Sequence, residues 1–297
     1  MAVEAAPARS AAARRSPVLR RLVRNPVAVA SLAVIVAMAA VALLAPLLAP
    51  FDYDHQDRHY ASLPAPPDGR HPLGTDNLGQ DVLSRLLHGA RVSLAVGIVV
   101  QLLSAVIGTA LGLLAAYKGG IWDRVLMRIT DAMFAFPDLL FAILLVGIFR
   151  PTSPVDSFLT VFVALGLVGW PGMARLVRGQ ALSLREKEFV EAARAIGVTG
   201  WGIVTRHLLP NMLTPIIVAV TVDIGNVILA EATLSFLGIG IQPPYPSWGR
   251  MISDARPFLR SAPSLILYPS LALGLLVLAL NFFGDALRDA LDPRQRR

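Results

Sequence analysis

The segment Glu188-Phe-Val-Glu-Ala-Ala-Arg-Ala-Ile-Gly197 lies between two long apolar stretches and is followed by Leu208-Leu-Pro-Asn211. Gly197 can adopt the left-handed conformation that ends a helix, Thr199 can cap the next helix, and Pro210 is expected to end that one. The sequence predicts two short amphipathic helices with a sharp corner, a shape suited to a groove on another protein. The apolar positions at helical spacing are Phe189, Ala192, Ala193 and Ile196, then Trp201, Val204 and Leu208.

The composition indicates a membrane protein. The 297 residues are 55% hydrophobic and 16% charged, and their mean hydropathy is +0.61. A soluble domain carries about a quarter charged residues. Because cysteine is absent, a disulfide framework and a thiolate metal site are excluded. The net charge of +7 comes from arginine clusters beside apolar runs, which is typical of membrane topology rather than of nucleic-acid binding.

Six apolar runs are long enough to cross a hydrocarbon core of about 30 Å, and together they predict an all-α, six-helix transmembrane domain over residues 27–284. Pro137 and Pro171 interrupt the third and fourth runs, which neighbouring helices can tolerate. Gly108 and Gly112 in the second run predict close packing against another helix. The expected spans are Val27–Leu48, Val92–Tyr117, Ala132–Phe149, Val155–Arg175, Met212–Leu237 and Ser264–Phe283.

The distribution of positive charge predicts the topology. With the N-terminus inside, 19 of the 27 Lys and Arg residues fall in inner segments and 8 in outer segments. This bias predicts that both termini are cytoplasmic. The inner segments are then the tail 1–26, the loop 179–211 that carries the hairpin, and the tail 285–297. The outer loops are 51–91 and 238–263.

The first span is expected to be an uncleaved anchor rather than a signal peptide. Its apolar run is longer than a signal-peptide core, and Pro46 and Pro50 disrupt a small-residue cleavage site. The Ala- and Arg-rich residues 1–16 ahead of it are expected to be disordered.

No catalytic motif is present in the sequence. The two lysines, Lys118 and Lys187, do not lie in a phosphate-binding loop, so ATP hydrolysis by that route would need another chain. No nucleophile elbow or paired-carboxylate site is found. His55 and His59 stand four residues apart and could bind a metal on a helix, but no third ligand is fixed. A solvated polar loop is the favoured interpretation, and no metal site is expected.

Ionisable groups at membrane depth usually face a cavity or a partner. Asp131 is interpreted as pairing with nearby Arg128. Asp223, Asn226 and Glu231 in the fifth span are expected to share one helix face and to line a translocation path. The alternative is an interhelical hydrogen bond that only stabilises assembly.

Three segments carry a resemblance to a known family. The hairpin is similar to the EAA loop of permease subunits of ATP-binding cassette (ABC) importers, although His207 stands where many members have isoleucine. The outer run His71–Ser93 and the later run Glu231–Gly249 resemble the second permease subunit of the dipeptide, oligopeptide and nickel group. Arg24-Asn-Pro26 and Asp292-Pro293 also fit, so that the resemblance covers residues 20–293. The positions that match the EAA motif are Glu191, Ala192, Ala193, Gly197, Leu209 and Pro210.

The resemblance implies a type I ABC importer permease in the cytoplasmic membrane. Expected partners are a homologous permease, two ATPase subunits or a fused pair, an external substrate-binding protein and membrane lipid. ATP and Mg would be used by the partner subunits, and this chain is expected to bind no cofactor and to be no enzyme. The residues expected to couple to the ATPase are Glu188, Glu191, Ala192, Ala193, Arg194, Gly197, Leu209 and Pro210.

The resemblance leaves the cargo open. Di- or oligopeptides are the expected substrates, and nickel complexes are the alternative within the same family. A secondary transporter is the competing class, but it would need an inverted repeat or a pore-lining motif, and none is found. Specificity in such importers resides largely in the binding protein.

Overall fold

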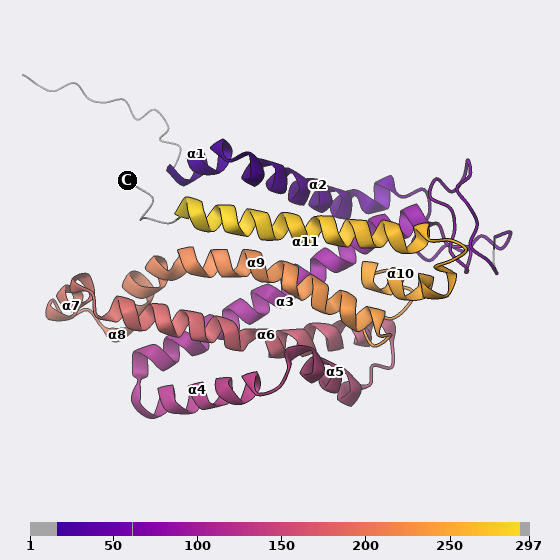
Figure 1. Cartoon of the computed structure of the whole chain (residues 1–297). Helices are drawn as coiled ribbons and strands as arrows, with labels where there is room; N and C mark the ends of the chain where they lie inside the picture. Colours follow the sequence, from indigo (N-terminus) through magenta and orange to yellow (C-terminus); the bar gives the residue numbers. More distant parts are fainter. Residues whose placement is uncertain (1–16, 61, 292–297) are drawn as a thin grey trace, which may run out of the picture.

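A computed structural model describes residues 17–60 and 62–291, which form helices joined by loops with isolated β-bridges (Figure 1). The expectation for residues 1–16 and the Asp292-Pro293 match lie outside the described residues. The long helices are α2 (Pro26–Leu48), α3 (Val82–Lys118), α6 (Pro154–Arg185), α9 (Leu209–Phe236) and α11 (Ser264–Leu291). The shorter helices are α1 (Pro17–Arg24), α4 (Gly120–Phe134), α5 (Asp138–Phe149), α7 (Glu188–Ala195), α8 (Gly200–Ile203) and α10 (Trp248–Ala255).

Five of the six expected spans are confirmed as apolar helices, whereas the expected third span, Ala132–Phe149, falls on a bent pair of helices. Five helical segments are long and apolar enough to cross a membrane, and the pair α4–α5 makes up to six if it counts as one bent span. The two helices of this pair meet at 90°, because Pro137 follows the end of α4 and precedes α5. Pro171, by contrast, lies buried inside the continuous helix α6, where neighbouring helices surround it.

Several helices run past the expected boundaries. Helix α3 begins inside the expected outer loop 51–91, and α6 extends into the expected inner loop 179–211. Helix α11 continues to Leu291, and α1 lies within the expected tail 1–26. These extensions contain charged residues, so a search for apolar runs ends the predicted span before them. Charged residues such as Arg, Lys and Glu nevertheless have good helix propensity, and the helices continue through them.

Helix α3 is the centre of the bundle, where it contacts α2, α6 and α9 (Figure 1). The predicted close packing at Gly108 and Gly112 is confirmed against α6. A Cβ at Gly108 would lie 2.6 Å from the Met173 Cβ, and one at Gly112 would lie 2.6 Å from the Ala174 carbonyl oxygen. Only glycine allows the two helices to approach this closely.

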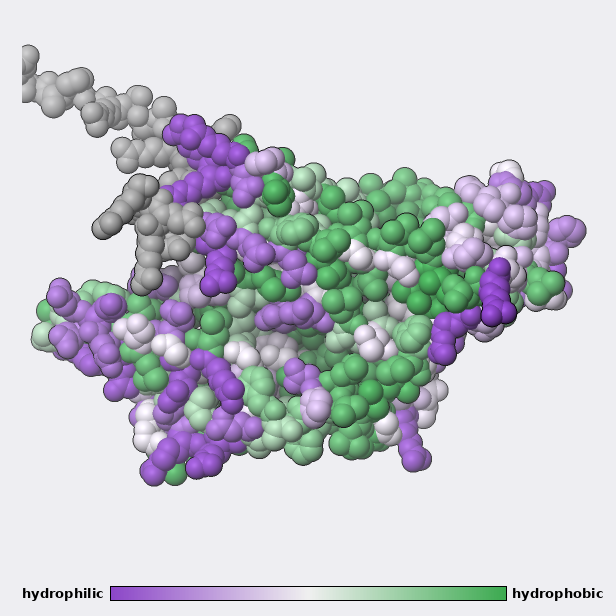
Figure 2. All heavy atoms as spheres, viewed as in Figure 1, coloured by the Kyte–Doolittle hydropathy of each residue, from purple (hydrophilic) through white to green (hydrophobic). Residues whose placement is uncertain are grey.

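The surface of the bundle is apolar around its middle. In Figure 2 hydrophobic residues form a broad band, and hydrophilic residues gather at the two ends. Leu43, Leu47 and Val106 are 78%, 82% and 68% exposed on this surface. A continuous apolar surface of this kind needs lipid or a protein partner to cover it. The chain is therefore a multi-pass membrane protein.

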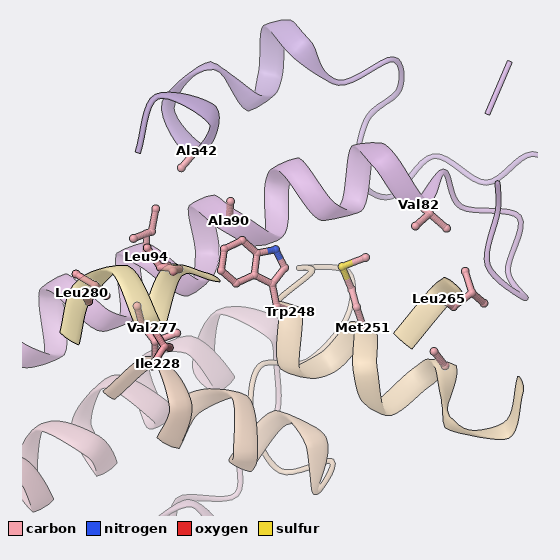
Figure 3. Packing of buried hydrophobic residues seen from close by; sticks show 12 residues of the cluster. Ala42, Val82, Ala90, Leu94, Ile228, Trp248, Met251, Leu265, Val277 and Leu280 are labelled. Atoms are coloured by element: carbon pink, nitrogen blue, oxygen red, sulfur yellow. The ribbon is translucent and has the colours of Figure 1, made fainter. Parts of the chain in front are cut away.

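The loop segments that follow α2 and α9 are folded against the bundle. His71 Nδ1 lies 2.9 Å from Asp81 Oδ1, and Asp81 caps α3 by accepting a bond from the Ser84 N–H at 2.7 Å. The indole of Trp248 lies beside Ala90 in the core, where its Nε1 donates to the Leu86 carbonyl at 3.1 Å (Figure 3). These two segments are therefore held in fixed positions over the helix ends.

Candidate functional site

The predicted hairpin forms a distinct projection at one end of the bundle (Figure 1). Helices α7 and α8 are joined at Gly197, whose φ is +82°. The chain turns because the Gly197 N–H bonds to the Arg194 carbonyl and the Val198 N–H bonds to the Ala193 carbonyl, both at 3.0 Å. The Thr199 hydroxyl accepts from the Gly202 N–H at 3.3 Å and caps α8. The predicted corner and cap are confirmed.

The apolar residues of the hairpin are divided between two surfaces. Val190 is buried in the cluster that contains Leu208, and Ala193 is also buried. In contrast, Phe189, Ile196 and Trp201 are 41%, 82% and 76% exposed. Each of the two expected apolar stripes is therefore split between an inward and an outward surface, because the inward residues hold the hairpin onto the bundle. The outward face leaves large apolar side chains available to another protein.

Pro210 does not end the second helix as the sequence predicted. The segment Val204–Leu208 forms a π-helical turn, and the chain continues through Leu209 and Pro210 into α9. The Leu209 N–H bonds to the Val204 carbonyl, five residues back. This wider turn accommodates a proline, which has no N–H and clashes with the carbonyl four residues back in a regular helix. The segment Gly200–Phe236 is thus one apolar helical run.

The charged side chains of the hairpin point outward. Glu188, Glu191 and Arg194 are exposed, and none of them bonds to another side chain in the described part of the chain. Ala192 is exposed beside them, whereas Leu209 is half-buried. The structure therefore brings the EAA residues of α7 and the corner together on one small projection and leaves their charges available, whereas Leu209 and Pro210 begin α9.

A cavity of about 410 Å³ lies between α3, α5, α6 and α9. Asp223 lines it and accepts hydrogen bonds from Gln101 Nε2 at 3.4 Å and from Asn226 Nδ2 at 3.2 Å. Asp138 and Thr233 add polar groups, and the rest of the lining is mostly apolar. No lysine or arginine is among the described lining residues. The cavity therefore combines a mostly apolar lining with two carboxyl groups, Asp138 and Asp223.

Glu231 does not share this face, so the expectation that it lies with Asp223 is wrong. Eight residues at about 100° each rotate Glu231 by roughly 80° away from Asp223. Glu231 is completely buried, and its Oε1 accepts from the Ser235 hydroxyl at 2.6 Å. That hydroxyl also accepts from the Ile241 N–H at 3.1 Å. Glu231 thus helps to hold the segment that follows α9, beside the hydroxyl of Ser247.

Two ion pairs connect α4 to α6. Asp131 pairs with Arg175 at 2.6 Å, so the expected pairing with Arg128 is wrong. Arg178 Nη2 donates to Asp123 at 2.7 Å. Residues 44 and 55 positions apart in sequence meet here, which local spacing could not reveal.

His55 and His59 lie in an irregular loop rather than on a helix. The ring of His55 stacks on Phe51 with centroids 5.2 Å apart. Among residues 17–60 and 62–291, no group of three metal-ligating side chains is found.

The sequence did not single out His71 as a site residue. Asp81 stands directly before an apolar run, which indicates that it caps a helix. Nothing in the local sequence indicates that the side chain of His71 would bond to the Asp81 carboxylate.

Comparisons with known proteins agree with this geometry. Residues 108–297 match the family described as binding-protein-dependent transport system inner membrane component, and residues 16–67 match the N-terminal TM domain of oligopeptide transport permease C. The fold is similar to a chain of the inward-facing MetNI methionine ABC transporter, with a TM-score of 0.57 and 23% identity over 70% of this chain and 97% of that chain. The chain therefore has the type I ABC importer permease fold.

Curated relatives cover almost the whole chain. The glutathione transport system permease protein GsiD of Pectobacterium atrosepticum is 44% identical over 93% of this chain and 89% of its own length. The dipeptide permease DppC of Alkalihalophilus pseudofirmus and the oligopeptide permease OppC of Haemophilus influenzae are each 41% identical, over 93% of this chain and 89% and 88% of their own lengths. The protein is thus a membrane transport permease rather than an enzyme. It belongs to the binding-protein-dependent transport system inner membrane component family.

Proposed function

We propose that this chain is a permease subunit of an ATP-driven importer that carries di- or oligopeptides across the cytoplasmic membrane. The observation that carries the proposal is the continuous helical run from the exposed hairpin to the polar cavity. Displacement of the hairpin can move α9, and Asp223 lies on α9 at the cavity. The named substrates of the relatives, dipeptides, oligopeptides and glutathione, support a peptide cargo.

In this proposal the hairpin docks in a cleft of an ATPase subunit. Phe189, Ile196 and Trp201 provide the apolar contact, because they are large and exposed. Glu188, Glu191 and Arg194 form charge-assisted hydrogen bonds across the interface. Ala192 leaves room for close approach, and the other EAA residues Ala193, Gly197, Leu209 and Pro210 set the shape of the hairpin. ATP and Mg act in the ATPase subunits, and this chain binds neither.

The orientation follows from the same assignment. The hairpin and both termini face the cytoplasm, where the ATPases are. The folded outer loops, which contain His71 and Trp248, then face a substrate-binding protein on the other side. A homologous permease completes the translocation path, with two ATPase subunits or one fused pair below.

Within the path, Asp223 and Asn226 contact the cargo, and Gln101 orients the Asp223 carboxylate. A carboxylate at membrane depth needs a hydrogen-bond donor or a cation, and the terminal ammonium group of a peptide can provide either. Glu231, which was expected in the path, instead stabilises the fold, through a bond to Ser235 on its own helix rather than through the interhelical bond of the alternative.

The experiment is uptake of labelled dipeptide into proteoliposomes that contain the complete complex with its binding protein. An ATPase-dead partner should abolish uptake. Uptake that persists with this partner would indicate a secondary transporter. ATP-driven uptake of a nickel complex, with no uptake of peptide, would favour the alternative cargo.

A further inference from the structure

Helix α1 carries an amphipathic surface that the transport mechanism does not use. Its sequence is Pro-Val-Leu-Arg-Arg-Leu-Val-Arg, from Pro17 to Arg24. At about 100° per residue, Leu19, Leu22 and Val23 fall on one side of the helix, and the three arginines fall on the other. Leu19 and Val23 are 48% and 60% exposed. This pattern of apolar and cationic faces is typical of helices that lie at a lipid surface.

The position of α1 suits such a role. It lies at the same end of the bundle as the hairpin, and in Figure 2 hydrophilic side chains gather there. Asn25 alone separates it from the span α2, whose first turn Asn25 caps. Arg21 Nη1 donates to the Ala290 carbonyl at the end of α11, at 3.3 Å. The helix is thus fixed where the spans leave the membrane.

The cationic face is also open to an anionic ligand. Arg20 and Arg24 are exposed, and no carboxylate pairs with either of them among the described residues. The sequence immediately before the helix adds Arg9, Arg14 and Arg15 and only one acidic residue, Glu4. Clusters of basic residues next to a span attract the negatively charged leaflet of a membrane.

We propose that α1 binds the headgroups of anionic phospholipids, with Val23 and Leu19 in the acyl region and Arg20 and Arg24 on the phosphates. The bond from Arg21 to Ala290 then links this lipid contact to the end of α11. The proposal does not depend on which substrate the permease carries. Each arginine near an anionic surface strengthens binding about fivefold, so removal of Arg20 and Arg24 should weaken it about 25-fold.

The chain has no cysteine, which allows a clean test with the full-length protein. Val23→Cys, labelled with an environment-sensitive fluorophore, is placed in nanodiscs of phosphatidylcholine alone or with roughly a third phosphatidylglycerol. The emission should shift to the blue with phosphatidylglycerol, and salt at about 0.5 M should reverse the shift. The double variant Arg20→Gln, Arg24→Gln should lose the shift.

The matched control is the double variant Arg58→Gln, Arg70→Gln, which removes the same charge from exposed positions outside α1. It should keep the shift. Equal emission in both lipid compositions would overturn the proposal, and so would loss of the shift in the control. A blue shift that requires added ATPase subunits, in either lipid, would assign the surface to a protein contact and would also overturn it.

Discussion

The corner at Gly197 provides a graded test of the hairpin. The φ of +82° lies in the left-handed region, where a residue with a Cβ is penalised by about 1–2 kcal/mol. Apart from its own chain neighbours, no atom of the described residues lies within 4 Å of a Cβ built at Gly197, so the cost is conformational rather than steric. Gly197→Ala should therefore reduce the population of the native corner about 5- to 30-fold.

Other side chains at the same position extend the series. Gly197→Asn should be tolerated better than alanine, because asparagine adopts the left-handed conformation more readily. Gly197→Val should be the worst, because a β-branched side chain is disfavoured most strongly at positive φ. Gly179→Ala is the control, since Gly179 is helical, is not at positive φ and has open space around it.

The assay measures co-purification of the ATPase subunits and ATP-driven uptake in proteoliposomes. Co-purification and uptake should both be highest in the native protein and fall through Gly197→Asn and Gly197→Ala to Gly197→Val. The Gly179→Ala control should stay at the native level. Normal assembly and uptake with Gly197→Val would refute the docking role of the corner. If Gly197→Asn were as defective as Gly197→Val, the conformational argument would be wrong.

Three further outcomes follow from the structure. Gly108→Val should lower the melting temperature in detergent, because overpacking of this kind costs about 1–3 kcal/mol, whereas Gly147→Ala, with no atom within 4 Å of the new Cβ, should not. Asp223→Asn should reduce uptake at least tenfold with assembly intact, an effect of about 1.4 kcal/mol. Glu231→Gln should instead reduce thermal stability and assembly of the complex first. If Asp223→Asn impaired assembly and Glu231→Gln impaired only uptake, both assignments would be contradicted. Arg58→Cys should react with an impermeant thiol reagent in intact cells, and labelling only after membrane rupture would reverse the topology.

The features that were predictable from the sequence depend on local chemistry. Apolar run length located the spans, and glycine at positions 108, 112 and 197 indicated close packing and a turn, because no other residue suits those backbones. The 90° break was marked by Pro137, although its angle was not predictable. Pro171 shows why: the same residue type stays inside a continuous helix when neighbours surround it.

The predictions that were wrong concern positions that depend on contacts between distant residues or on the rotation of residues around a helix. Asp131 pairs with Arg175 rather than with a neighbour on its own helix. Glu231 was placed on the wrong face because eight residues exceed two helical turns by roughly 80°. Pro210 is accommodated by a π-helical turn, which no sequence pattern announces. The pairing of Asp131 and the π-helical turn depend on the tertiary arrangement, whereas the rotation of Glu231 follows from residue spacing and could have been worked out from the sequence.

The central claim is that the hairpin transmits ATPase movement to the path, and one crosslink tests it most directly. Ile196 is 82% exposed at the tip, and the native chain contains no cysteine. Ile196→Cys should crosslink to a cysteine in the cleft of the ATPase in proteoliposomes. The crosslink should stop ATP-driven peptide uptake, and reduction should restore it. A crosslink that never forms, or one that leaves uptake unchanged, would contradict the account.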